Sequence, residues 1–167
     1  MKKPNMDEQT KPRPNGHIWM SAEQFYNAAE LIMANESVDL NRYVLPLLVN
    51  YALCVELSLK AAEGTVMCKP VSQAGLISAS ATKSAVRGHE LDKVFAALQS
   101  DTQRKIANEF SVATGEPLMP LLEICSNYFI QARYSYEQIG AAYDLTAVRT
   151  LARGLLQAVR VFDQKSP

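Results

Sequence analysis

The segment from Asp39 to Glu63 constrains the fold more than any other part of the chain. Several of its apolar residues recur at alternating spacings of three and four, the period of an α-helix: Leu45, Leu48, Ala52, Val55 and Leu59. Leu47, Tyr51 and Cys54 widen this stripe until little polar face remains. Because a helix that is apolar on most sides has to be surrounded by other elements, we expect this one at the centre of a bundle.

Similar patterns predict further helices on both sides of this segment. Ser21 is a suitable N-cap for a helix that ends near Asn35. A final helix is expected near Tyr143 to Asp163, with one apolar seam formed by Leu145, Val148, Ala152, Leu155, Val159 and Phe162. Shorter helices are predicted over three ranges: 89–98, 100–112 and 118–132. Because no segment alternates with a period of two, the sequence predicts an all-α fold of about five to six helices.

The remaining segments are polar and mark the limits of one domain. Residues 1–16 are rich in Pro, Lys, Asn and Asp, and we expect a flexible tail there. Gly64 is a suitable C-cap for the central helix, and residues 64–88, which are small and polar, predict a long loop. A single helical domain is therefore expected over residues 17–163, followed by a short C-terminal tail at 164–167.

Charge and cysteine content argue against several classes of function. Lys plus Arg equals Asp plus Glu at 17 each, so the chain lacks the positive excess of a dedicated nucleic-acid binder. A net charge of zero is still compatible with a local basic stripe. Three cysteines without zinc-like spacing predict neither a disulfide framework nor a metal site, and we expect Cys54 and Cys125 in the core. No signal peptide or spanning segment is recognised, so a cytoplasmic protein without a cofactor is expected.

Glu56 and Lys60 are polar residues in an otherwise apolar helix. They lie four apart, in the favourable order for an ion pair within a helix. One interpretation is that the helix end emerges into solvent here. The other is a partly buried carboxylate held by Lys60 and a second cation from another helix, because an unpaired buried charge is costly.

His89 follows Gly88 at the expected start of a helix. A structural hydrogen bond across the bundle is one interpretation. The other is general-base chemistry, which requires an orienting partner and a substrate within reach.

Arg133 opens a polar phrase that contains Tyr134 and Tyr136 and ends at Glu137. Two tyrosines and an arginine beside a helix end can form a cleft whose rings stack and whose guanidinium binds phosphate or carboxylate. The alternative is a structural corner, in which the tyrosines pack inward and Arg133 pairs with an acid such as Glu56.

Three arginines of the final helix share one side of it. Arg149, Arg153 and Arg160 lie within about 40° of one another and flank the apolar seam. They form either a solvated basic face or a stripe that follows phosphates, whose binding would weaken steeply with salt.

Three phrases, taken in order, resemble bacterial members of the HEPN superfamily (higher eukaryotes and prokaryotes nucleotide-binding domains). They are residues 51–60 (YALCVELSLK), 88–91 (GHEL) and 132–137 (ARYSYE), and the likeness covers about residues 20–163. It implies an antiparallel helical bundle that is commonly a homodimer. It also implies association with RNA or a nucleotide, often in toxin–antitoxin or phage-defence systems.

Many members of the superfamily are metal-independent endoribonucleases whose active site uses an arginine, four to six intervening residues and a histidine. Here no histidine follows Arg133, and Arg87 is only two positions before His89. The resemblance therefore predicts a non-catalytic module that binds RNA, a nucleotide or a partner protein near His89, Arg133 and the tyrosines. The alternative is a divergent endoribonuclease in which Arg133 stabilises the phosphorane and His89 moves a proton.

Overall fold

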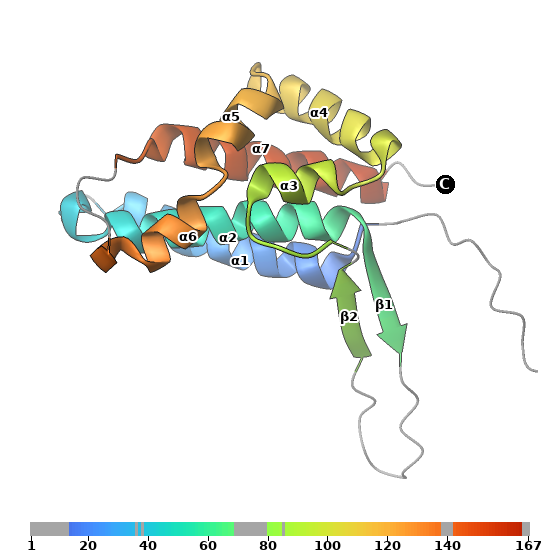
Figure 1. Cartoon of the computed structure of the whole chain (residues 1–167), viewed down its shortest axis with the longest axis horizontal. Coiled ribbons are helices and arrows are strands. Elements are labelled where there is room, and N and C mark those ends of the chain that lie inside the picture. Colours follow the sequence, from blue (N-terminus) through green and yellow to red (C-terminus); the bar gives the residue numbers. More distant parts are fainter. Residues whose placement is uncertain are drawn as a thin grey trace, which may run out of the picture.

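The computed structural model describes residues 14–35, 37, 39–68, 80–84, 86–137 and 142–164, and only the backbone of 65–68, 80–84, 137 and 161–164. These residues form seven α-helices, two 3-10 turns (Leu40–Arg42 and Ser135–Glu137) and a two-stranded hairpin (Figure 1). The helices are α1 (Gly16–Met33), α2 (Val44–Ala62), α3 (Leu91–Ala96), α4 (Ser100–Thr114), α5 (Leu118–Cys125), α6 (Tyr128–Arg133) and α7 (Leu145–Gln164). The predicted all-α helical bundle is confirmed.

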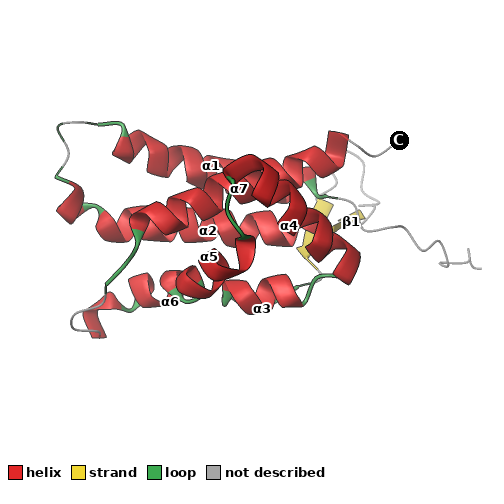
Figure 2. Cartoon of the chain, turned by 90° about the horizontal axis from the view of Figure 1, so that it is seen from above, coloured by secondary structure: helices red, strands yellow, loops and turns green. Residues whose placement is uncertain are grey.

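The central position predicted for α2 is confirmed. Helices α1, α3, α6 and α7 all pack against it. Figure 2 shows α1 on one side of α2 and both α3 and α6 on the other. Among the described residues, α2 is the one helix long and apolar enough to cross a membrane, and its burial among these neighbours explains the same composition.

Helix α1 begins earlier than the sequence indicates. Its N-cap is Asn15, not Ser21, and the Asn15 side chain accepts a hydrogen bond from the backbone N–H of Ile18 at 3.1 Å. The backbone N–H of Asn15 donates to the carbonyl of Ala61 at 2.7 Å, which ties the start of α1 to the end of α2. The predicted tail therefore extends too far, and its other residues lie before the described part of the chain.

Residues 64–88, expected as a long loop, begin and end in antiparallel strands. Strand β1 (Gly64–Cys68) pairs with β2 (Ser80–Ser84), with Gly64 opposite Ser84. Residues 69–79, which complete the expected loop, lie outside the described residues. Neither strand shows the alternation of apolar and polar residues by which a half-buried strand is recognised, since the apolar residues of β1 are consecutive and β2 is mostly polar, so the sequence did not predict the pairing.

Gly64 starts β1 and is not the C-cap of α2, which is Glu63. A Cβ atom at Gly64 would lie 2.5 Å from the Cβ of Asn15. A glycine is required here because the strand passes directly over the cap of α1, not because the helix end adopts a left-handed conformation.

The single helix expected over residues 118–132 is divided into α5 and α6 by a turn at Ser126 and Asn127. The hydroxyl of Ser126 donates to the carboxylate of Asp92, and its carbonyl accepts from the N–H of Leu91 at 3.2 Å. These bonds join the turn to the start of α3. The chain changes direction there, and α6 packs against α2.

Helices α4 and α7 approach each other closely at Gly154. A Cβ atom there would lie 2.4 Å from the ring of Phe110 and 2.6 Å from the methyl group of Thr114. The predicted turn after α4 is present, with Gly115 as a left-handed C-cap at a φ of 76°. Four residues of the predicted seam of α7 are buried: Val148, Ala152, Leu155 and Val159.

Candidate functional site

Two polar residues of α2 meet His89, whose side chain is half exposed. Glu56 is 4% exposed; its Oε1 accepts from Lys60 Nζ at 2.5 Å, and its Oε2 lies 2.9 Å from His89 Nδ1. We call these three residues the Glu56 cluster. A helix end in solvent is therefore the wrong interpretation, and a buried carboxylate held from two sides is the right one. Two partners offset the cost of burying this charge.

The segment before α3 brings His89 to this position. Gly88 has a φ of 109°, a conformation that side chains rarely allow, and the chain turns there on its way from the hairpin into α3. An ionised carboxylate can only accept hydrogen bonds, so a bond to an ionised Glu56 requires the tautomer of His89 that carries its proton on Nδ1. The His89 side chain is 53% exposed, so a ligand can reach it from solvent.

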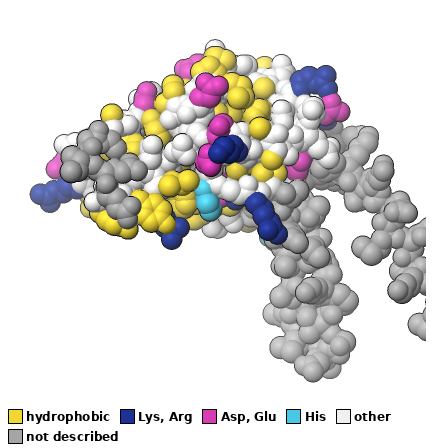
Figure 3. Space-filling model, in the orientation of Figure 1, with side chains coloured by type: hydrophobic (Ala, Val, Ile, Leu, Met, Phe, Trp, Pro, Cys, Tyr) yellow, Lys and Arg dark blue, Asp and Glu magenta, His cyan; other side chains and the backbone are white. Residues whose placement is uncertain are grey.

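Helix α6 extends this site with an aromatic ring. The ring of Phe129 lies against His89, with the two centroids 5.3 Å apart and the planes inclined by 36°. Arg133 follows one turn later on the same side of α6. Figure 3 shows an area of hydrophobic side chains on the face that α3 and α6 cover.

Two exposed tyrosines continue the row. The guanidinium of Arg133 lies 5.5 Å from the ring centroid of Tyr134, and the ring of Tyr134 lies 6.4 Å from that of Tyr136. We call His89, Phe129, Arg133, Tyr134 and Tyr136 the α6 surface. It combines aromatic rings with two nitrogen-bearing groups on one open side of the molecule.

The structural-corner interpretation of this phrase is wrong in two respects. Among the described residues, the carboxylate of Glu56 binds Lys60 and His89 and not Arg133. The tyrosines do not pack inward, since Tyr136 is 77% exposed and Tyr134 is also open to solvent. Glu137 closes the second 3-10 turn, and its side chain lies outside the described ones.

The basic stripe of α7 divides into two parts. Arg149 binds Glu30 of α1 through two hydrogen bonds, at 2.8 and 2.6 Å, and Tyr51 donates to the same carboxylate at 2.7 Å. The bonds from Arg149 hold the pKa of Glu30 below its usual value, while burial raises the pKa of Tyr51. Arg153 and Arg160 are exposed. The guanidinium of Arg160 lies 5.7 Å from the ring of Trp19.

Sequence reasoning missed Phe129 and Glu30 as members of these sites. Phe129 lies within an apolar run, where a core position is the ordinary expectation. Glu30 is 119 residues from its partner Arg149, so no local spacing signals the pair.

The two cysteines predicted in the core are buried there. Burial raises the pKa of the Cys54 thiol and of the Cys125 thiol to about 12, so both remain protonated at neutral pH. Within the part of the chain that the structure describes, no three His, Cys, Asp or Glu side chains gather in a way that could hold a metal ion.

Comparisons with known proteins do not assign the chain to a family. No family model matches the chain, and neither the curated proteins nor the solved structures include a match. The fold and the site define an all-α bundle in which a buried carboxylate binds a lysine and a half-exposed histidine, beside an exposed aromatic and basic surface.

Proposed function

We propose that this protein is a non-catalytic, HEPN-like binding module that holds single-stranded RNA on the α6 surface. The observation that carries the proposal is the row of rings and charge formed by His89, Phe129 and Arg133 on one side of the bundle. RNA suits this surface better than a mononucleotide or a folded protein partner, because the surface is open and offers several rings in succession.

The chemistry of the surface matches a single strand. Unpaired bases stack on exposed rings such as Tyr134 and Tyr136, at about 1–3 kcal/mol per base in known complexes. The guanidinium of Arg133 can bind a phosphate through two parallel hydrogen bonds. Glu56 contributes indirectly, since it fixes the orientation of His89 while Lys60 balances its negative charge.

The proposal includes a homodimer in the cytoplasm, as part of a toxin–antitoxin or defence system. Two copies of a weak surface bind one strand far more tightly than a single copy, because the second contact becomes intramolecular. Light scattering coupled to size-exclusion chromatography tests this part. A mass of twice 18.5 kDa supports it, and a monomer at all concentrations contradicts it.

Fluorescence anisotropy of a short labelled RNA tests the binding itself. Arg133→Gln should weaken binding about tenfold and reduce the salt dependence by about one phosphate contact. Tyr136→Ala should weaken binding without changing the salt dependence. The matched control is Arg104→Gln, which removes an arginine of α4 that is 77% exposed and is not part of the α6 surface.

Equal effects of Arg133→Gln and Arg104→Gln would mean that RNA binds by charge alone, and the α6 surface would then have no special role. Absence of RNA binding by the unaltered protein would refute the proposal. Saturable binding of a folded partner in place of RNA would also refute it.

A second candidate function is a metal-independent endoribonuclease, and the bond between Glu56 and His89 favours it. A carboxylate that holds Nδ1–H leaves Nε2 as a proton acceptor, the arrangement used by general-base histidines. Arg133 would stabilise the negative charge of the phosphorane. RNA cleavage in the presence of EDTA should then fall by about 100-fold or more in His89→Ala. Cleavage that survives this substitution comes from a contaminant.

A further inference from the structure

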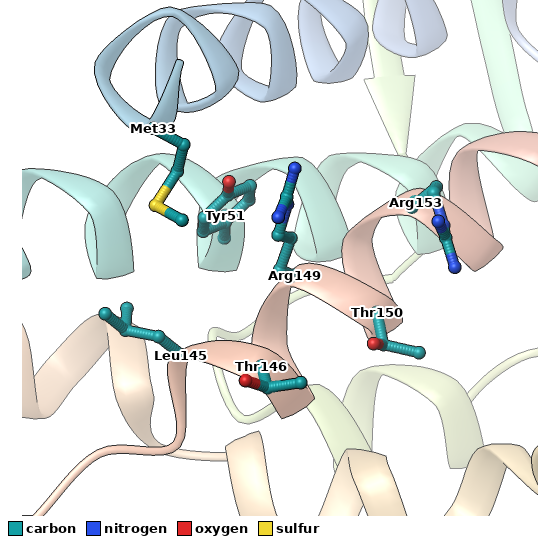
Figure 4. A pocket seen from close by; sticks show the side chains of 7 residues that line it. All are labelled: Met33, Tyr51, Leu145, Thr146, Arg149, Thr150 and Arg153. Atoms are coloured by element: carbon teal, nitrogen blue, oxygen red, sulfur yellow. The ribbon is translucent and has the colours of Figure 1, made fainter. Parts of the chain in front are cut away.

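A cavity of about 220 Å³ lies where α1, α2 and α7 meet. It is lined by Met33 of α1, Tyr51 of α2, and five residues of α7: Leu145, Thr146, Arg149, Thr150 and Arg153 (Figure 4). Since a water molecule takes roughly 30 Å³ in the liquid, the cavity has room for a ligand of about seven or eight non-hydrogen atoms. None of its lining residues belongs to the α6 surface, so the cavity is a separate candidate site.

Arg153 supplies the positive charge that this cavity offers to a ligand. Arg149 also lines it, but two of its nitrogens donate to the carboxylate of Glu30, at 2.8 and 2.6 Å. Arg153 is exposed and forms no ion pair with any other described residue. The described residues that line the cavity include no acidic side chain. One guanidinium therefore remains available, and it suits a ligand with a single negative charge.

The end of the cavity opposite Arg153 is apolar. Met33 and Leu145, both half-buried, lie at this end (Figure 4). Leu145 and Arg153 are eight positions apart, which corresponds to about 12 Å along α7. Tyr51 donates its hydroxyl to Glu30 at 2.7 Å, so it offers mainly its ring to the cavity. A ligand with a negative charge at one end and a hydrocarbon chain at the other would match this separation.

A second cavity, of about 180 Å³, also borders Arg153 but is less suited to an anionic ligand. The guanidinium of Arg160 lies over the ring of Trp19, 5.7 Å from its centroid, and so occupies one face of the indole. Glu23 lines the same cavity and would repel a negative charge. A ligand that is held by Arg153 is therefore expected in the larger cavity.

We propose that the larger cavity binds a small carboxylic acid with a short aliphatic chain, of which hexanoate is representative. Its carboxylate accepts hydrogen bonds from the guanidinium of Arg153 and from the hydroxyl of Thr150, one turn earlier on α7. Its chain lies against Met33 and Leu145. A carboxylate fits better than a phosphate monoester, because Arg153 balances one negative charge and a second would remain uncompensated close to Glu30.

The NMR signals of the methionine methyl groups report on this site directly. The chain has six methionines, and the Met33→Leu variant identifies the signal of Met33. The full chain, labelled with ¹³C at these methyl groups, is titrated with acetate, butyrate, pentanoate and hexanoate. The Met33 signal should shift and saturate, while that of Met119 on α5 stays in place. From butyrate to hexanoate, the affinity should rise about fourfold with each added methylene group, because each one is removed from water.

A neutral analogue and two substitutions test the contact with the carboxylate. Hexan-1-ol has the same chain without the charge, and it should bind about fivefold more weakly than hexanoate, as expected for an ion pair with an exposed arginine. Arg153→Gln should weaken hexanoate by the same factor and leave the affinity for hexan-1-ol unchanged. Arg104→Gln, the matched control on α4, should leave both affinities unchanged.

Three results would overturn the inference. The first is a lack of saturable shift of the Met33 signal with hexanoate, measured on protein whose circular dichroism shows a folded bundle. The second is equal affinity for hexanoate and hexan-1-ol, which would mean that Arg153 does not recognise the carboxylate. The third is equal affinity for hexanoate and acetate, which would leave an anion site that does not recognise the chain.

Discussion

Removal of the Glu56 carboxylate should destabilise the bundle, because the residue is buried and both its oxygens are engaged. In Glu56→Leu, the ammonium of Lys60, whose side chain is only 16% exposed, loses its partner. Breaking a fully buried pair in this way costs about 3–5 kcal/mol. Since Lys60 and His89 retain access to water, we expect about 2 kcal/mol of unfolding free energy to be lost, or roughly 4–8 °C in Tm.

A double substitution tests the reasoning behind this value. If the cost comes from the stranded ammonium of Lys60, then Glu56→Leu combined with Lys60→Met should recover most of the stability, because an apolar pair replaces a buried charged one. Urea unfolding followed by circular dichroism gives the four free energies of the double-mutant cycle. Glu56→Leu within about 0.5 kcal/mol of the unaltered protein would refute the account, because surface substitutions have effects of that size.

Three further predictions concern the packing, the pH dependence and the thiols. Gly154→Ala should lower the unfolding free energy by about 1–3 kcal/mol in thermal or urea unfolding, since its Cβ would enter the Phe110 ring; an unchanged stability would contradict the close approach. The pKa of Glu30 is lowered in the folded state, so its contribution to stability is fully present above its usual value of 4.5 and is lost as the pH falls through the lowered folded pKa; Glu30→Gln should therefore cost about 1 kcal/mol at pH 7 and progressively less as the pH falls below 4.5. Cys54 and Cys125 should react with a thiol reagent at pH 8 only after denaturation, and rapid labelling of either one in the folded protein would contradict their burial.

The elements that local sequence determines were predicted correctly. Helix α2 was placed at the centre because its apolar stripe covers most of its circumference, and its burial agrees. The turn after α4 was recognised from Gly115, which adopts the left-handed conformation that glycine favours. The buried state of Cys54 followed from the same apolar pattern.

The features that distant contacts determine were missed. Asn15 caps α1 within a segment that looks like a tail in the sequence. Its position depends on the bond from its backbone N–H to the carbonyl of Ala61, near the end of α2. The break between α5 and α6 depends on the bond of Ser126 to Asp92, 34 residues earlier. Neither contact affects the local spacing of apolar residues by which helices are recognised in a sequence.

In the candidate site, too, the contacts between near neighbours in the sequence could be predicted and the distant ones could not. An ion pair of Glu56 with Lys60 could be predicted because both residues belong to one helix. The second partner was predicted as a cation from another helix; it is instead His89, which lies before α3, and it is brought there by the path of the chain through Gly88. The contact of His89 with Phe129 depends in addition on the turn that directs α6 against α2.

The most direct test of RNA binding at the α6 surface is the NMR signal of the two imidazoles in the chain during titration with single-stranded RNA. His89 and His17 are its only histidines, and His17 lies on α1, away from the α6 surface. We predict that the ring signals of His89 shift progressively and saturate, while those of His17 stay in place. Binding that leaves His89 unchanged, or that shifts both rings equally, would contradict the account.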